Sequence, residues 1–158
     1  MSAITNINEF DPNKADNAEE IEMQWSVKTV EHMEAYENLI TSTDPKTLKL
    51  SSDDDAIHAD LLAKFPEFRD HANLRNLDEN WLKSKEGKER WREWLASYEQ
   101  SIPDYNFGTM LRQHSDQLYS EHNAILVLRA QFVAIEIARN RAGLNEKVYH
   151  EAQAAKKA

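Results

Sequence analysis

The sequence feature that most constrains the fold is the apolar run from Ile125 to Arg141, which reads ILVLRAQFVAIEIARNR. On a helical wheel its apolar side chains cover nearly the whole circumference, and a helix that is apolar on all sides is buried on all sides. The run is shorter and more charged than the roughly 20 apolar residues that a transmembrane helix requires. We therefore predict a central buried helix at about residues 121–142, around which the other helices pack.

Three polar residues interrupt this apolar run at spacings of seven and four residues. Arg129 and Glu136 fall, with Asn140, in one narrow stripe of the predicted helix, which we interpret as a structural polar stripe. A charge taken out of water needs a partner, so Arg129 and Glu136 should each find one across the stripe or on a neighbouring helix. Ser120 is the candidate cap of the amino end, and Gly143 can adopt the left-handed conformation that closes the other end.

The rarity of turn-forming residues favours helices throughout. The 158 residues include only three glycines and four prolines, whereas sandwiches and barrels use many of both in their turns. We predict an all-α fold, a single orthogonal-type helical bundle wrapped around the central helix. Residues 1–17 are predicted to form a flexible acidic and polar leader, residues 18–150 a single helical domain, and residues 151–158 a frayed tail.

The net charge of −9 restricts the classes of partner. Binding to nucleic acid or to an anionic membrane needs concentrated lysine and arginine, so we expect neither direct nucleic-acid binding nor a membrane. A basic protein surface remains open as a partner, and the alternative is that acidity only keeps the domain soluble. The chain contains no cysteine and no apolar signal core, which suits a cytoplasmic protein, with a nuclear pool as a further compartment.

Motifs that carry chemistry are weak in this chain. Asp55 and His58 stand one helical turn apart, but such a pair is half a metal site, and helix-start acidity explains the aspartates better. Gly87, Gly108 and Gly143 are too far apart to form a phosphate-binding loop. We therefore predict no catalytic residue, no metal and no cofactor, and a protein that is not an enzyme.

The segment from Asp104 to Arg112, DYNFGTMLR, is the one stretch that favours a binding function. It is irregular, contains a glycine, and carries two aromatic residues and an arginine, which are the residue types enriched in protein contacts. The alternative is a tight connection whose aromatic side chains, Tyr105 and Phe107, fill the core beneath the central helix. Both interpretations stay open at this point.

The chain resembles the eukaryotic family called polysaccharide biosynthesis domain-containing protein 1. The resemblance rests on IEMQW, on EHMEAYENLI followed by STDPKTLKL, on KERWR, on DYNFGTMLR and on QFVAIEIARNRAGLN, which together span about Ile21 to Tyr149. The combination of NFG with the downstream IEIARNR is the specific part. The chain ends soon after its last predicted helix, without the long acidic extension of animal members.

The resemblance implies a dedicated, non-enzymatic chaperone of translation elongation factor 1-alpha. Such a protein is expected to act as a monomer that binds the newly made GTP-binding domain at the ribosome, together with the nascent polypeptide-associated complex, and releases it on folding. Alternatives are an enzyme or accessory factor of polysaccharide modification, as the family name suggests, or a structural adaptor subunit. By inference from the family motif, the partner-binding residues are Tyr105, Asn106, Phe107, Gly108, Arg112, Arg139, Asn140 and Arg141.

Overall fold

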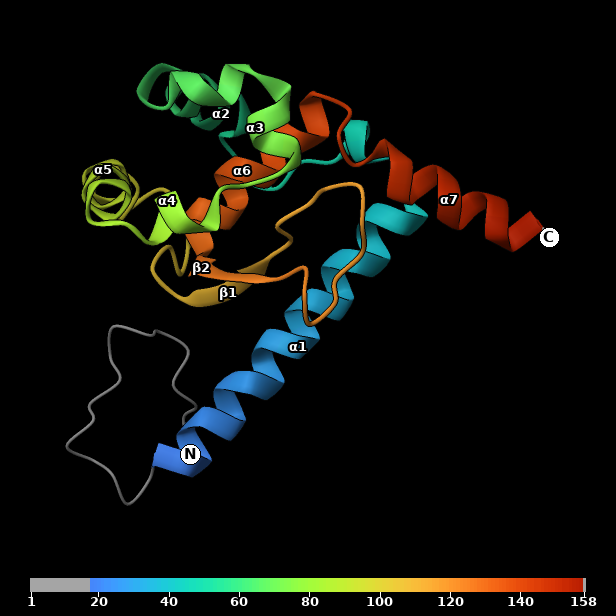
Figure 1. Ribbon diagram of the computed structural model, residues 1–158, viewed down its shortest axis with the longest axis horizontal. Coiled ribbons are helices and arrows are strands. Elements are labelled where there is room, and N and C mark those ends of the chain that lie inside the picture. Colours follow the sequence, from blue (N-terminus) through green and yellow to red (C-terminus); the bar gives the residue numbers. More distant parts are fainter. Residues whose placement is uncertain (1–17, 158) are drawn as a thin grey trace.

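The computed structural model describes residues 18–157, with side chains from residue 27 onward (Figure 1). The predicted leader, residues 1–17, lies outside the described residues. In chain order the elements are α1 (Ala18–Ser42), η3 (Pro45–Thr47), α2 (Asp54–Lys64), η4 (Pro66–Arg69), α3 (His71–Arg75), α4 (Glu79–Lys83), α5 (Lys85–Ala96), β1 (Gly108–Leu111), β2 (Ile125–Leu128), α6 (Arg129–Arg141) and α7 (Glu146–Lys157).

The prediction of an all-α fold is wrong, because β1 and β2 form a two-stranded antiparallel sheet in a chain that is otherwise mostly helical. Gly108 pairs with Leu128 and Leu111 pairs with Ile125. A short apolar run fits a buried strand as well as a buried helix, and periodicity alone does not separate the two. The predicted helix over residues 121–142 is therefore a strand, β2, followed at once by the shorter helix α6, and Ser120 caps neither element.

Helix α6 nevertheless occupies the centre of the fold. It contacts α2, α3, α5, η3 and both strands, so other elements surround it (Figure 1). Every residue from Phe132 to Asn140 is buried, as expected for a helix whose apolar residues cover its whole circumference. The predicted buried central helix is thus found in α6, which is buried over residues 132–140, and not over residues 121–128.

Helix α1 is long and only partly covered. Its carboxyl-terminal half packs against α7 and β1, and in Figure 1 its amino-terminal half extends away from the other elements. Val27 and Val30 accordingly expose about half of their side chains, 52% and 49%, whereas Tyr36 and Ile40 are buried. Helix α7 continues through the predicted tail as far as Lys157.

A cluster of aromatic side chains joins α2 to α5. Phe65 stacks on Trp91 with ring centroids 4.1 Å apart, and Trp91 meets Trp94 edge to face at 5.3 Å. The Arg90 guanidinium lies 4.7 Å from the centroid of Phe65 and forms an ion pair with Glu67. Because Trp91 and Trp94 come from α5 and Phe65 follows α2, this cluster holds α5 against the end of α2.

Polar side chains and one glycine mark the ends of several helices. The Ser84 hydroxyl accepts a hydrogen bond from the Gly87 amide at the start of α5, and the Asp78 carboxylate accepts one from the Trp81 amide at the start of α4. Gly143 has a φ of +76° and follows α6 as the left-handed residue. None of the helices in the described residues has the length and apolar content needed to cross a bilayer.

Candidate protein-binding groove

The loop that precedes β1 is anchored to the amino end of α6. The Phe107 amide donates to the Asp104 carbonyl over 2.9 Å, which closes a tight turn with Asp104 at a φ of +57°. The loop carbonyls then satisfy free amides of the helix: Arg129 donates to Phe107 over 2.7 Å and Ala130 donates to Tyr105 over 2.9 Å. Because the first amides of a helix have no partner within it, this loop caps α6 with its own backbone.

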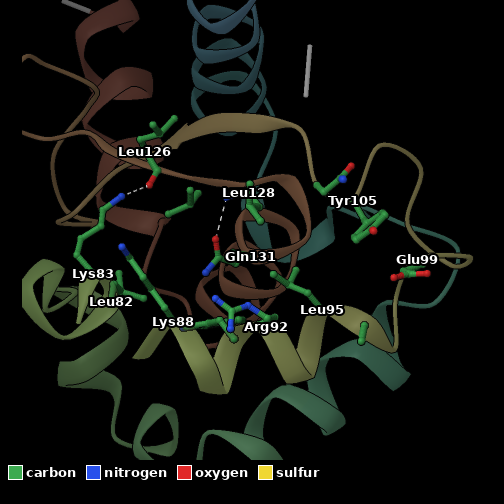
Figure 2. A pocket seen from close by; sticks show the side chains of 14 residues that line it. Leu82, Lys83, Lys88, Arg92, Leu95, Glu99, Tyr105, Leu126, Leu128 and Gln131 are labelled. Atoms are coloured by element: carbon green, nitrogen blue, oxygen red, sulfur yellow. Dashed lines mark hydrogen bonds between the residues drawn. The ribbon is translucent and has the colours of Figure 1, made fainter. Parts of the chain in front are cut away.

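A groove of about 580 Å³ separates this loop and β2 from α4 and α5 (Figure 2). Its walls are mainly apolar and come from four elements of the fold. The apolar lining consists of Leu82, Trp91, Leu95, Ala96, Tyr105, Leu126, Val127 and Leu128. A groove with this volume and lining can accept one or two apolar side chains of a partner.

The polar residues at the groove carry an excess of positive charge. Lys83, Lys88 and Arg92 line it against the single carboxylate of Glu99. Lys88, Arg92 and Leu95 share one face of α5 because they are spaced by four and three residues. This local cationic rim contrasts with the net charge of −9 of the chain. The groove therefore suits a partner that offers apolar side chains together with carboxylates.

Two polar side chains contact the backbone of β2 within the groove. Lys83 Nζ donates to the Leu126 carbonyl over 2.5 Å, and the Leu128 amide donates to Gln131 Oε1 over 2.8 Å (Figure 2). Burial lowers the pKa of Lys83 below its ordinary value, and the nearby Lys88 acts in the same direction. On the opposite wall, partial burial and then the Glu99 carboxylate raise the pKa of the Tyr105 hydroxyl.

A second set of polar residues lies in the interior, around the carboxylate of Glu136. Arg112 Nη2 lies 3.3 Å from Glu136 Oε1, Arg139 Nη1 lies 3.0 Å from Oε2, and none of the three side chains is exposed to solvent. The Tyr36 hydroxyl donates to the same carboxylate over 2.6 Å, and Asn145 Nδ2 donates over 3.0 Å. Burial by itself would raise the pKa of Glu136, but the two guanidinium groups hold this pKa below its ordinary value.

Comparison with known proteins identifies the family of the chain. The family model described as PBDC1 protein matches residues 21–150, which is most of the chain. The chain is 43% identical over 137 residues to the PBDC1 homolog of Saccharomyces cerevisiae, and this match covers 87% of the chain and 94% of the yeast protein. The chain belongs to the PBDC1 family. The resemblance seen in the sequence is therefore confirmed.

Other PBDC1 relatives show how far the similarity extends. The PBDC1 homolog of Schizosaccharomyces pombe is 45% identical, with 87% of this chain and 93% of that protein covered. Human PBDC1 is 42% identical over the same share of this chain, which covers only 57% of the human protein. A solution NMR structure of a Saccharomyces cerevisiae protein superimposes with a TM-score of 0.79 at 41% identity, covering 91% of this chain and 99% of that chain.

The structure distributes the predicted partner-binding residues over four places, three at the surface and one in the interior. Tyr105 and Asn106 line the groove, whereas Phe107 and Gly108 line a smaller hollow of about 210 Å³ beside α1. Arg141 lies at the exposed end of α6, where its guanidinium binds Asp55 over 2.6 Å. These five residues remain available to a partner.

Arg112, Arg139 and Asn140 are instead buried, with exposed fractions of 0%, 0% and 3%. The expectation of a surface built from these three residues is therefore corrected: they serve the interior network around Glu136. Arginine at the end of an irregular segment is typical of a surface contact, but here the carboxylate of Glu136 lies within reach beneath β1. A substitution such as Arg112→Glu would report on folding rather than on partner binding.

The structure also revises the predicted Arg129 and Glu136 stripe. Glu136 has buried partners, as expected, but they are Arg112 and Arg139 rather than Arg129. Arg129 lies at the amino end of α6, half-buried beside Lys28 and His32. Burial lowers the pKa of His32, and the charge of Arg129 lowers it further.

Sequence reasoning missed the residues of α5 and β2 that complete the groove. Lys88 and Arg92 belong to the stretch KERWR, which contributes to the family resemblance, but their position opposite Tyr105 depends on the tertiary structure. Leu126 and Leu128 were expected on a helix. They line the groove because residues 125–128 form the strand β2 instead. A helical wheel of α5 with attention to charge would have identified the cationic face.

Proposed function

We propose that this PBDC1 family member is a non-enzymatic chaperone that binds the newly made GTP-binding domain of translation elongation factor 1-alpha and releases it on folding. The proposal combines the family resemblance with one structural observation, the groove between α5, β2 and the loop at Tyr105. An apolar groove with a polar rim has the chemistry needed to shield apolar surface that a client has not yet buried.

Release follows from a difference in affinity between two states of the client. A ligand favours the state to which it binds more tightly, so a chaperone that contacts only unburied apolar segments loses its site when the client folds. Each tenfold difference in affinity corresponds to about 1.4 kcal/mol. The energy for release would thus come from the folding and nucleotide binding of the client itself.

The cellular setting belongs to the same proposal. Binding to a newly made domain would take place in the cytoplasm at the ribosome, with the nascent polypeptide-associated complex as a neighbour and this protein acting as a monomer. The PBDC1 resemblance is the support for these partners, and the groove is the surface that we assign to the client.

Site-specific crosslinking during translation tests the proposal. A photoreactive amino acid replaces Arg92, which lines the groove, or Glu93, which lies next to it on α5 but is exposed outside the groove. We expect the group at position 92 to crosslink to ribosome-bound GTP-binding domain, and the group at position 93 to crosslink much less. Folded, GTP-loaded domain should give little crosslinking at either position.

Two results would count against this function. Equal crosslinking to nascent and to folded, nucleotide-loaded client would indicate a structural adaptor rather than a chaperone. No crosslinking to the nascent domain from the groove, with the variant folded as judged by its circular dichroism, would exclude the groove as the client site. In the same assay Tyr105→Ala should reduce capture about tenfold, as truncation of a central aromatic contact does.

A further inference from the structure

The strand β2 has one edge that no other strand covers in the described part of the chain. Its inner edge pairs with β1 in the register Gly108 with Leu128. At its outer edge the Leu126 carbonyl and the Leu128 amide are contacted by the side chains of Lys83 and Gln131 (Figure 2). Side chains therefore occupy the positions at which a further strand would place its backbone groups.

The direction of the backbone groups of β2 follows from antiparallel geometry. In such a pair the amide and the carbonyl of one residue point to the same side of the strand, and alternate residues point to opposite sides. Since the Leu126 carbonyl meets Lys83 outside the sheet, the Leu126 amide also faces outward, into the groove. Leu126 and Leu128 thus present a short row of backbone donors and acceptors to a partner.

The chemistry of the groove restricts what such a partner can be. An exposed strand edge is a template for another extended segment, and side-chain pockets next to the edge select among segments. Here the pocket beside β2 is lined by Trp91 and Leu95, and the rim of α5 carries Lys88 and Arg92. A segment with alternating apolar and acidic residues complements both the pocket and the rim.

We propose that the outer edge of β2 accepts an extended, acidic and apolar segment of the partner as an added strand. The apolar side chains of the segment enter the groove, and its carboxylates pair with Lys88 and Arg92. To admit the segment, the side chains of Lys83 and Gln131 leave the backbone of β2, which exposes two hydrogen-bonding groups for the incoming strand. This inference rests on the proposed function, because it describes how the client occupies the groove, and incompletely folded domains expose unpaired strands.

Synthetic peptides provide the test of strand addition. The probe is a fluorescent heptapeptide in which glutamate alternates with valine and leucine, and two further versions are N-methylated, one at the glutamates and one at the apolar residues. Because only alternate residues of an added strand bond to β2, one methylated version should bind at least tenfold more weakly while the other binds like the parent. Amide exchange at Leu126 should slow when the parent peptide binds. Equal binding of all three peptides, or no binding of the parent, would overturn the inference.

Charge reversal tests the assignment of the rim. The double variant Lys88→Glu and Arg92→Glu should bind the glutamate peptide at least tenfold more weakly and should prefer a peptide in which lysine replaces glutamate. Lys85→Glu is the matched control, because Lys85 is exposed on the same helix but does not line the groove. If the double variant does not fold, a salt titration of the unaltered chain decides: affinity for the glutamate peptide that is independent of salt overturns the role of the rim.

Competition with the client separates this inference from the proposed function. Nascent GTP-binding domain captured by the unaltered chain should be displaced by the parent peptide and not by the weakly binding methylated one. Capture that neither peptide displaces would overturn strand addition and leave the chaperone function standing. Peptide binding with the methylation pattern above, but without client capture, would support strand addition and contradict the proposed client.

Discussion

Arg112 and Glu136, which lie 24 residues apart in the chain, form an ion pair of 3.3 Å with no solvent exposure of either side chain. The same carboxylate binds Arg139, so one negative charge faces two guanidinium groups in the interior. Backbone carbonyls accept from further nitrogens of both arginines, for instance the Ser115 carbonyl at 2.8 Å from Arg112 and the Leu74 carbonyl at 2.8 Å from Arg139, whereas Arg112 Nε has no hydrogen-bond partner among the described residues. The network ties α6 to β1 and to the loop that follows it.

The first prediction concerns the loss of the central carboxylate. Glu136→Gln removes the only side-chain anion that contacts the two buried guanidinium groups in the described residues. Removing one partner of a buried ion pair costs about 3–5 kcal/mol, so urea denaturation should show a decrease of this size in the free energy of unfolding. Glu151→Gln, at an exposed pair with Lys147, should change it by less than about 1 kcal/mol. A Glu136→Gln variant as stable as the control would contradict the prediction.

The second prediction is the pH dependence that Glu136 produces. Its pKa is lower in the folded state than the ordinary value of 4.5, so between these two values the unfolded state binds more protons than the folded state. The contribution of Glu136 to the free energy of unfolding is therefore complete above pH 4.5 and is lost as the pH falls through the folded pKa. The free energy of unfolding, measured by denaturation at several pH values from pH 6 to pH 3, should fall more with decreasing pH for the unaltered chain than for Glu136→Gln. Parallel profiles would show that Glu136 does not titrate in this way.

The third prediction compares two tyrosine hydroxyls. Tyr36 donates to Glu136 in the buried network over 2.6 Å, and Tyr98 donates to Asp60 at a partly exposed position, also over 2.6 Å. Loss of a hydrogen bond to a buried charged group costs about 1–3 kcal/mol, so Tyr36→Phe should lower the free energy of unfolding by this amount. Tyr98→Phe should cost less, because water can replace the hydroxyl at Asp60. If thermal or urea denaturation shows that both substitutions lower the free energy of unfolding equally, burial does not strengthen the Tyr36 hydrogen bond.

The fourth prediction contrasts two glycines that are needed for different reasons. Gly143 has a φ of +76°, but a Cβ there would have room, with its nearest neighbour, Lys46 Cε, at 3.4 Å. Gly143→Ala should therefore lower the free energy of unfolding by about 1–2 kcal/mol, which is the strain of a left-handed backbone at a residue with a Cβ. At Gly87 a Cβ would lie 2.1 Å from the Trp81 carbonyl oxygen, so the backbone must shift. Calorimetry should find Gly87→Ala the less stable variant, and the reverse order would contradict this account.

Local signals in the sequence account for several helix ends. Ser84 and Asp78 cap helices within three residues of themselves, and Gly143 takes the left-handed conformation predicted from its place after two arginines. These outcomes depend on groups that are neighbours in the chain, so no knowledge of the fold is needed. The apolar run likewise predicted that Phe132 to Ala138 would be buried, whereas Arg139 and Asn140 were expected at a partner surface and are buried as well.

What the sequence determined by itself was that the apolar part of α6 must be buried, where several helices begin and end, and to which family the chain belongs. Only the tertiary structure decided that Ile125–Leu128 is a strand, because its partner β1 comes from another part of the chain. It also decided that Arg112 faces Glu136 rather than solvent, and that Lys88 and Arg92 face Tyr105 across a groove. The physical reason is the same in each case: a non-local contact sets the free energy of these residues, and periodicity within one segment carries no information about a partner far along the chain.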